Sequence, residues 1–266
     1  MLEEPEDLGP LTHDAIAGSF RITQRLRGHR YSVDDVLTAW EAASTAPNAQ
    51  RCLELGSGIG SVLLMLAYKL PEARFVAVEA QRNSFRLLGQ NVSQNGLDLR
   101  VTRLHGDLRS AVTSALAAEH GPFDLITGTP PYVPLGTATP SSDSQKAYAR
   151  QELRGGVEDY LAAMGRALAP RGRGVVCADA RFPERVLEGA RRAGLCVVRR
   201  RDVVPRAGKG ALFAVFTVAR VEEGMLSCER VADWIARDGD GARTAEYVAV
   251  REFFGVAAPV GEAPSP

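Results

Sequence analysis

A glycine-rich segment directly after a short apolar run has the residue types needed to bind a nucleotide-like ligand. It reads Glu54-Leu55-Gly56-Ser57-Gly58-Ile59-Gly60 and leads straight into an apolar stretch with helical character. Glycines are needed at such a turn because the backbone must bend sharply and let a ligand approach where a Cβ atom would collide. The dinucleotide fingerprint GxGxxG would place its third glycine at position 61, which is Ser61. Binding of a nicotinamide dinucleotide is therefore disfavoured.

Acidic residues stand at or just after the ends of three successive apolar runs. Glu54 precedes the first glycine by two residues, Glu79 comes nineteen residues after Gly60, and Asp107 follows the third run. The ExGxGxG spacing resembles the first motif of S-adenosylmethionine-dependent methyltransferases. That resemblance implies that Glu54 faces the amino group of the methionine moiety, where a carboxylate suits a cation and would repel a pyrophosphate. It also implies that Glu79 accepts hydrogen bonds from both ribose hydroxyls and that Asp107 meets the adenine amino group. The expected cofactor-binding residues are Glu54, Gly56, Gly58, Gly60, Glu79 and Asp107.

A proline-rich loop follows the fourth apolar run and reads Thr129-Pro130-Pro131-Tyr132. Two prolines stiffen the loop and remove backbone donors, which leaves carbonyl groups free to accept the hydrogens of a target NH2 group. Tyr132 can stack on a flat substrate that is held out of its helix or chain. The loop resembles the (N/D/S)PP(Y/F) loop of methyltransferases that act on a planar nitrogen, either an exocyclic base amine or a side-chain amide.

The chemistry of such a loop depends on acceptors for the amine hydrogens. Two acceptors localise the lone pair of the nitrogen towards the methyl sulfonium, so no strong general base is needed before in-line attack. Thr129 stands where the pattern usually has asparagine, and its hydroxyl cannot present an amide carbonyl at the same reach. The expected catalytic residues are Thr129, Pro130, Pro131 and Tyr132, and the threonine puts activity in question rather than cofactor binding.

The elements that must position these residues alternate regularly along the chain. Short valine- and leucine-rich runs typical of buried strands occur at 51–55, 74–78, 99–104, 123–127 and 174–178, and helical patterns occur at 62–69, 84–94, 110–119, 157–168 and 183–193. This repeat predicts an α/β fold, with a doubly wound, mostly parallel sheet covered by helices on both faces. The runs at 196–204 and 211–218 are too close for a helical crossover and predict an antiparallel hairpin at its end.

The expected domain organisation is one methyltransferase domain with short extensions. Residues 1–18 read as a flexible leader, 19–220 as the domain with an N-terminal hairpin and helix, 221–256 as a C-terminal extension packed on it, and 257–266 as a disordered tail. Within the domain, 20–24 alternates as a strand does, and the turn at 27–29 is expected to fold it back before a helix at 34–43.

Composition excludes several classes of protein. The chain of 266 residues is 45% hydrophobic and 24% charged, which fits a globular domain and excludes a disordered or collagen-like chain. Its four cysteines form no CxxC pair, so neither a zinc site nor a disulfide framework is expected. No apolar stretch approaches the ~20 residues of a membrane span, and the acidic first eighteen residues are unlike an export signal. We therefore expect a cytoplasmic protein with no metal and no membrane partner.

The charge balance conceals an asymmetry. The 32 basic and 32 acidic residues cancel, yet residues 19–30 have a local excess of +4 and residues 181–209 one of +6. Such stretches can form one positive face for nucleic acid, or they can be a scatter of solvated arginines.

Three further stretches resemble the bacterial tRNA (adenine-N6) methyltransferases that modify valine tRNA. The residues Tyr31-Ser32-Val33-Asp34-Asp35-Val36-Leu37 resemble their S-x-D-x-(V/I)-L-L-x-A segment, and Ala149-Arg150-Gln151-Glu152 resembles the region behind their catalytic loop. Near the end, Arg243-Thr244-Ala245-Glu246-Tyr247 with Phe253-Phe254 resembles their terminal signature. The resemblance covers residues 20–255 and implies methyl transfer from S-adenosylmethionine to adenine N6 in a structured RNA, with a tRNA as the expected substrate.

Two alternatives stay open at this point. A protein glutamine N5-methyltransferase presents the same two-acceptor loop to a side-chain amide. A binding protein that keeps S-adenosylmethionine but has lost catalysis through Thr129 is the second. The sequence does not determine which RNA or nucleotide is the substrate, or the oligomeric state.

Overall fold

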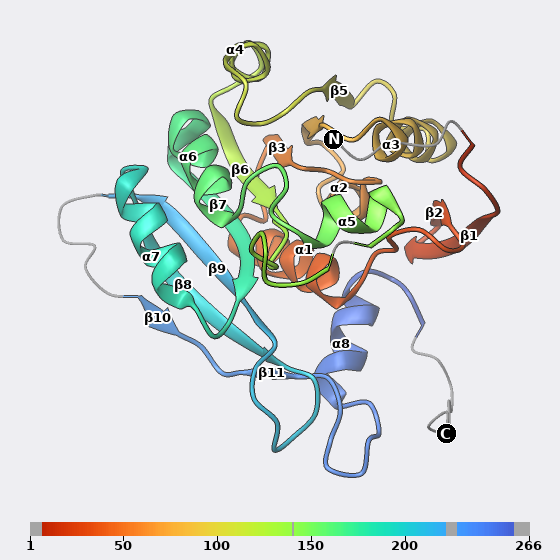
Figure 1. The fold of residues 1–266 in the computed structure, drawn as a ribbon, viewed down its shortest axis with the longest axis vertical. Helices are drawn as coiled ribbons and strands as arrows, with labels where there is room; N and C mark the ends of the chain where they lie inside the picture. Colours follow the sequence, from red (N-terminus) through yellow and green to blue (C-terminus); the bar gives the residue numbers. More distant parts are fainter. Residues whose placement is uncertain (1–6, 140, 222–227, 258–266) are drawn as a thin grey trace.

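The computed structural model describes residues 7–139, 141–221 and 228–257, and its elements alternate along the chain as expected (Figure 1). The strands are β1 (Leu11–Ala17), β2 (Phe20–Arg25), β3 (Arg51–Leu55), β4 (Arg74–Glu79), β5 (Val101–His105), β6 (Phe123–Gly128), β7 (Leu168–Asp179), β8 (Leu195–Val204), β9 (Phe213–Arg220), β10 (Glu229–Arg230) and β11 (Trp234–Ile235). The helices are α1 (Val33–Thr45), α2 (Ser61–Lys69), α3 (Arg82–Gln94), α4 (Ala111–Ala118), α5 (Ser144–Arg150), α6 (Val157–Ala167), α7 (Pro183–Arg192) and α8 (Ala245–Phe253).

The central sheet has the strand order β10-β8-β9-β7-β6-β3-β4-β5, with β11 beside β8. Strands β5, β4, β3, β6 and β7 are parallel, whereas β9 is antiparallel to both β7 and β8. The chain order reverses at β3, where the connections pass to opposite sides, so the carboxyl ends of β3 and β6 flank a natural ligand site. The predicted doubly wound sheet that ends in an antiparallel hairpin is confirmed.

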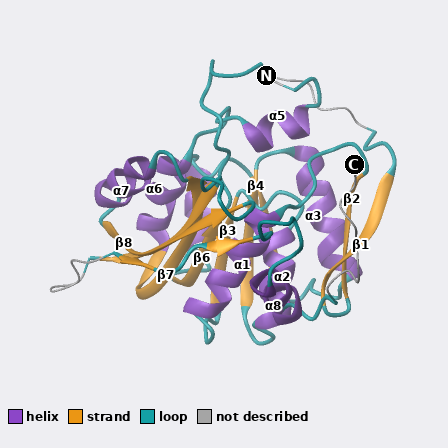
Figure 2. Cartoon of the chain, turned by 90° about the horizontal axis from the view of Figure 1, so that it is seen from below, coloured by secondary structure: helices purple, strands orange, loops and turns teal. Residues whose placement is uncertain are grey.

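Helices cover both faces of the sheet (Figure 2). One face packs against α1, α2 and α3, and the other against α4, α6 and α7. Each face has its own buried core, centred on the apolar side chains of α2 on one side and on Leu161, Met164 and Phe216 on the other. Burial on both faces explains why the strands read as near-continuous apolar runs.

The expectation of a flexible leader at 1–18 was wrong for residues 11–17. They form β1, which pairs antiparallel with β2, so the hairpin partner precedes β2 instead of following it through the turn at 27–29. Ile16 and Ala17 are buried against the main core. Burial of these side chains and the backbone hydrogen bonds to β2 offset the weak strand pattern of this segment. Residues 1–6 lie outside the described residues.

The C-terminal extension belongs to the same body as the sheet. Strands β10 and β11 extend its edge beside β8, and α8 contacts both α1 and β11. Phe254 is buried, and its carbonyl accepts a hydrogen bond from the backbone of Gly18 (2.7 Å), which ties this end of the chain to the β1–β2 turn. The expected tail at 257–266 lies outside the described residues except for Ala257.

The two arginine-rich stretches are largely neutralised by acids. Arg199 and Arg201 both pair with Glu41 on α1, whereas Arg200 pairs with Asp202, as expected for alternation along a strand. Other arginines in these stretches pair in the same way: Arg25 with Asp143, Arg30 with Asp14, Arg181 with Asp179, Arg185 with Glu152 and Glu158, and Arg192 with Glu188. Their local excess of positive charge therefore does not form one open face.

No described helix combines the length and apolar character that a bilayer span requires. Within the described ranges, His, Cys, Asp and Glu side chains likewise form no group of three or more suited to holding a metal ion.

Candidate functional site

The glycine-rich turn between β3 and α2 requires glycine for two separate reasons. Gly56 and Gly58 have φ values of +60° and +54°, a region that side chains with a Cβ rarely adopt. At Gly56 a Cβ atom would also lie 2.1 Å from the hydroxyl of the buried Tyr160 on α6. At Gly58 the surrounding space is open, so this stretch of backbone faces a cavity.

Glu79, at the end of β4, fixes the shape of this turn. Its Oε2 accepts a hydrogen bond from the backbone N–H of Gly58 (2.7 Å), and its Oε1 accepts one from the N–H of Gln81 (2.6 Å). The side chain is buried but still lines the cavity that opens above the glycine turn. One carboxylate therefore connects two neighbouring loops and presents its edge to any ligand between them.

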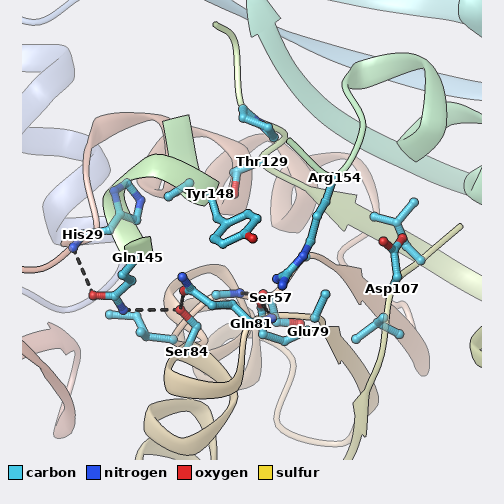
Figure 3. A pocket seen from close by; sticks show the side chains of 18 of the residues that line it. His29, Ser57, Glu79, Gln81, Ser84, Asp107, Thr129, Gln145, Tyr148 and Arg154 are labelled. Atoms are coloured by element: carbon cyan, nitrogen blue, oxygen red, sulfur yellow. Dashed lines mark hydrogen bonds between the residues drawn. The ribbon is translucent and has the colours of Figure 1, made fainter. Parts of the chain in front are cut away.

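This central cavity lies over the carboxyl ends of β3, β4, β5 and β6 and encloses about 890 Å³ including its open mouth. Gly56, Gly58, Glu79, Asp107, Thr129 and Pro131 all line it. Tyr148 and Arg154 reach in from the opposite side, and Arg154 extends towards Glu79 and Ser57 (Figure 3). The guanidinium of Arg154 also lies 4.0 Å from the ring centre of Tyr148. Residues from four strand ends therefore surround one cavity.

Buried polar atoms in this cavity fit a ligand of the expected kind. The Nε2 of Gln81 is buried and has no partner among the described residues, whereas its Oε1 accepts a hydrogen bond from Ser84 Oγ (2.6 Å). An unpaired buried donor is costly, so it favours an acceptor on a bound molecule. Open glycine backbone, a carboxylate edge and this donor together suit the ribose and adenine of S-adenosylmethionine.

Asp107 lies at the rim of the central cavity, where Arg109 holds its carboxylate. Its carboxylate accepts hydrogen bonds from Arg109 Nε (3.0 Å) and Nη2 (2.7 Å), and these contacts lower the pKa of Asp107 below its ordinary value. The group is therefore ionised at neutral pH and keeps lone pairs for a further donor.

Glu54 and Gly60 lie beneath the glycine turn instead of lining the cavity. Gly60 is the N-cap of α2 with φ +88°, and a Cβ there would lie 2.7 Å from Leu88. The Glu54 side chain is only 4% exposed, and its Oε2 has no partner among the described residues. Burial, together with the charge of Asp35, raises the pKa of Glu54 well above its ordinary value. A direct contact of Glu54 with a methionine amino group stays a prediction.

The proline loop leaves β6 beside the glycine turn. Gly128, at the end of β6, packs under the ring of Tyr160, where a Cβ would lie 2.5 Å from that ring. Thr129 and Pro131 face the central cavity and Pro130 is buried between them. The Thr129 hydroxyl donates to Asp35 Oδ1 at 3.4 Å, so a carboxylate from α1 stands next to the first residue of the loop.

Tyr132 lies on the far side of the loop from the central cavity. Its ring is parallel to that of Phe213, with centroids 6.4 Å apart, and its hydroxyl lies 2.7 Å from Cys177 Sγ and 3.2 Å from Asp34 Oδ2. Burial is the main cause that raises the pKa of Tyr132 well above its usual range. With one ring face covered by Phe213, only the opposite face remains for a stacked substrate.

A second cavity, the outer hollow, borders the central cavity. It encloses about 1060 Å³ including its mouth and is lined by Tyr132, Lys146 and Arg150, among others. His29, Tyr31 and Ala149 line both spaces, so a group held in the outer hollow lies next to the central cavity. Lys146 and Arg150, here called the basic rim, form no ion pair with another described residue.

Sequence reasoning missed several cavity residues. Asp35 appeared only within the resemblance to a family segment, and Gln81, Tyr148 and Arg154 were not singled out. Gln81 follows Glu79 by two residues and carried a usable signal, because the loop after a parallel strand faces the ligand edge of the sheet. Tyr148 and Arg154 come from α5 and the loop behind it, and Asp35 comes from α1. The positions of these segments over the cavity depend on packing between distant parts of the chain.

Comparison with known protein families supports a methyltransferase. Residues 38–145 match the family model of the methyltransferase small domain. A curated relative from Aeromonas hydrophila, named tRNA1(Val) (adenine(37)-N6)-methyltransferase, is 31% identical over 222 residues, which cover 82% of this chain and 86% of that protein. A ribosomal protein uL3 glutamine methyltransferase from Bradyrhizobium diazoefficiens is 28% identical over 148 residues, covering 51% of this chain and 44% of that one.

Among solved structures, a predicted O-methyltransferase from Agrobacterium tumefaciens is similar in fold. The two superpose with a TM-score of 0.63 at 17% identity, covering 86% of this chain and all of the other. At this level of identity the likeness concerns the fold alone, and it agrees with the doubly wound sheet described above.

Proposed function

The chain belongs to the tRNA1(Val) (adenine(37)-N6)-methyltransferase family, and we propose that it transfers the methyl group of S-adenosylmethionine to the N6 amine of an adenine in a tRNA. The observation that carries this proposal is the junction of two spaces at the proline loop. The central cavity has the residues for the donor, and it shares His29, Tyr31 and Ala149 with the outer hollow. The proline loop lines the first space with Thr129 and Pro131 and the second with Tyr132. A tRNA substrate also favours a cytoplasmic location.

The cofactor-binding residues are those at the carboxyl edge of the sheet. Gly56 and Gly58 leave backbone exposed to the ligand, and Glu79 is placed to accept hydrogen bonds from the ribose hydroxyls. Asp107 at the rim is placed for the adenine amino group, with the Gln81 amide as an additional donor. Glu54 and Gly60 shape the turn from below, and a cationic group bound above Glu54 would favour the ionised form of this buried carboxyl.

The catalytic residues orient the amine and exclude water. When bound, S-adenosylmethionine supplies an electrophilic methyl carbon on a sulfonium. The Pro130 carbonyl accepts an amine hydrogen and the Thr129 side chain helps to orient the amine, which localises the nitrogen lone pair in the direction of attack. Pro131 keeps the loop rigid, and Tyr132 packs its open face against the base in the outer hollow. Catalysis by such a loop rests on positioning more than on a strong base.

The test is methyl transfer by the purified protein with radiolabelled S-adenosylmethionine. Unmodified tRNA and a peptide that contains an exposed glutamine are offered as separate acceptors, and nucleoside analysis of the labelled tRNA identifies the product. We expect label in N6-methyladenosine. Label on another nucleoside, or on the peptide alone, contradicts the proposal.

The glutamine methyltransferase alternative is kept because a relative of that activity is also similar to this chain. The two substrate classes differ in their response to salt. Binding of tRNA releases counterions and weakens steeply between about 50 and 200 mM salt, whereas binding of a short neutral peptide does not. A flat salt response of the substrate KM therefore favours the protein substrate.

A further inference from the structure

The Asp35 carboxyl group lies where three parts of the site meet. It is on the first turn of α1 and only 7% exposed, yet it lines the central cavity together with Thr129 and Ser61. Its Oδ2 accepts a hydrogen bond from the backbone N–H of Ser32 (3.0 Å), and its Oδ1 lies 3.4 Å from Thr129 Oγ1. The Ser61 hydroxyl at the start of α2 is a second side-chain donor to it.

The position of Asp35 matters because the proline loop lacks a strong second acceptor for the amine hydrogens. An amine that is to attack in line needs an acceptor for each of its two hydrogens. The Pro130 carbonyl can serve one of them. The Thr129 hydroxyl is a weak choice for the other, because it is short and already donates towards Asp35. The carboxylate beyond it is a stronger acceptor than a hydroxyl.

We propose that Asp35 is a catalytic residue that replaces the missing side-chain acceptor of the loop, accepting one amine hydrogen beside Thr129 and taking the proton released on methyl transfer. The amine nitrogen forms its bond to the methyl carbon as the carbon–sulfur bond breaks, and the electron pair of that bond stays on sulfur. The methylated nitrogen then carries one proton too many. That proton passes to Asp35, and from the neutral carboxyl group to water.

The surroundings of Asp35 suit this role. Burial, followed by the charge of Asp34, raises the pKa of Asp35 to about 7. Other titratable groups face it from β3 (Glu54), from the proline loop (Tyr132) and from β7 (Cys177). A carboxyl group that titrates near neutrality can accept a proton and release it again at the working pH.

The inference rests on the proposed function and is tested with the full chain in a tRNA methylation assay. We expect Asp35→Ala to lower kcat about 100-fold or more, while calorimetry finds the Kd for S-adenosylmethionine changed less than threefold. Asp35→Asn keeps an acceptor oxygen but cannot take the proton. Its residual kcat should therefore lack the rise with pH that we expect the unaltered protein to show around pH 7.

A second substitution distinguishes the loss of a hydrogen-bond acceptor from a disturbance of the fold. Adding Thr129→Asn to Asp35→Ala places an amide carbonyl on the loop, and we expect at least a tenfold recovery of kcat. Asp98→Ala, an exposed acid in the loop after α3, is the matched control and should leave kcat unchanged. Circular dichroism and thermal unfolding establish that each variant is folded.

Three results would overturn the assignment. An increase in the Kd for S-adenosylmethionine that matches the loss of kcat would make Asp35 a cofactor ligand. An unchanged kcat in Asp35→Ala, or an unchanged pH profile in Asp35→Asn, would remove it from the chemistry. If the unaltered protein methylates the glutamine peptide instead of tRNA, the proposed function fails, and the same variants test Asp35 on that amide.

Discussion

At the residue scale, the two buried acids Glu54 and Asp35 affect the stability of the protein as well as its chemistry. Burial raises the pKa of each, and the charge of Asp35 raises the pKa of Glu54 further. A carboxyl group whose pKa is raised on folding stabilises the folded state below its unfolded pKa, and this contribution is lost as the pH rises through the folded pKa. The site therefore costs stability at neutral and alkaline pH.

Replacing Glu54 by glutamine should reverse part of that cost. We expect Glu54→Gln to gain stability relative to the unaltered protein as the pH rises from 5 to 8. The difference between their free energies of unfolding should increase by up to about 1.4 kcal/mol for each pH unit of the titration. Urea unfolding at the two pH values measures the difference. The same relative stability at both pH values would mean that Glu54 titrates normally in the folded protein.

Glu79 and Tyr132 should separate cofactor binding from transfer. Glu79→Ala removes the group that holds Gly58 and Gln81, so we expect the Kd for S-adenosylmethionine to rise at least tenfold. Tyr132→Ala should abolish transfer to tRNA and leave that Kd nearly unchanged, because the ring lies outside the central cavity. Calorimetry and the methylation assay give the two readouts. Equal losses of cofactor affinity in both variants would contradict the division of roles.

How far the sequence defines the site differs among these residues. The positions of Gly56, Gly58 and Glu79 follow from spacing, since a glycine turn and an acid at the next strand end must meet at one edge of a parallel sheet. The contact between Asp35 and Thr129 joins residues 94 positions apart, and it depends on where α1 docks. No local pattern specifies that docking.

At the scale of elements, Asn91 on α3 attaches the β1–β2 hairpin to the domain. Its Oδ1 accepts a hydrogen bond from Thr23 N (2.7 Å), and its Nδ2 donates to Thr23 O (3.0 Å) and to Ile59 O (2.8 Å). This fully buried side chain connects an edge of β2, the helix and the glycine turn. Apolar periodicity predicted the central strands and helices. It carries no information about contacts between a side chain and distant backbone, and the strand that pairs with β2 was therefore predicted wrongly.

Asn91→Ala should cost about 2–4 kcal/mol of stability, because it leaves buried backbone groups of Thr23 and Ile59 without partners. Its loss should also weaken S-adenosylmethionine binding through the glycine turn. Asn95→Ala is the matched control. Asn95 is half-buried and makes similar but solvent-exposed hydrogen bonds to the backbone of Arg21, so its loss should cost less than about 1 kcal/mol. Urea unfolding measures both. A cost for Asn91→Ala no larger than that for Asn95→Ala would show that the hairpin is held by other contacts.

At the scale of the whole molecule, the charge distribution decides how a polyanion can approach. The net charge is zero, and most arginines of the two basic stretches are paired with acids. Lys146 and Arg150 of the basic rim are among the basic residues that form no ion pair with another described residue, and they are the ones that line the outer hollow. The number of charges follows from the sequence, but which arginines are neutralised does not. The acids that pair with them are distant in sequence, as Glu41 is from Arg199 and Arg201.

The basic rim should therefore carry much of the salt-dependent affinity for tRNA. Each phosphate contact contributes a slope of roughly −0.7 to −0.9 to the dependence of log K on log salt concentration. If Lys146 and Arg150 each contact a phosphate, Lys146→Ala with Arg150→Ala should flatten the slope by about 1.4–1.8 and leave the Kd for S-adenosylmethionine unchanged. Arg171→Ala with Arg191→Ala removes the same charge from exposed positions away from both cavities, and this control should retain the full slope. Filter binding of tRNA between 50 and 200 mM salt compares the two. If the salt slope flattened equally in both double variants, only the total charge of the protein would matter, and tRNA would not bind preferentially to the face near Tyr132.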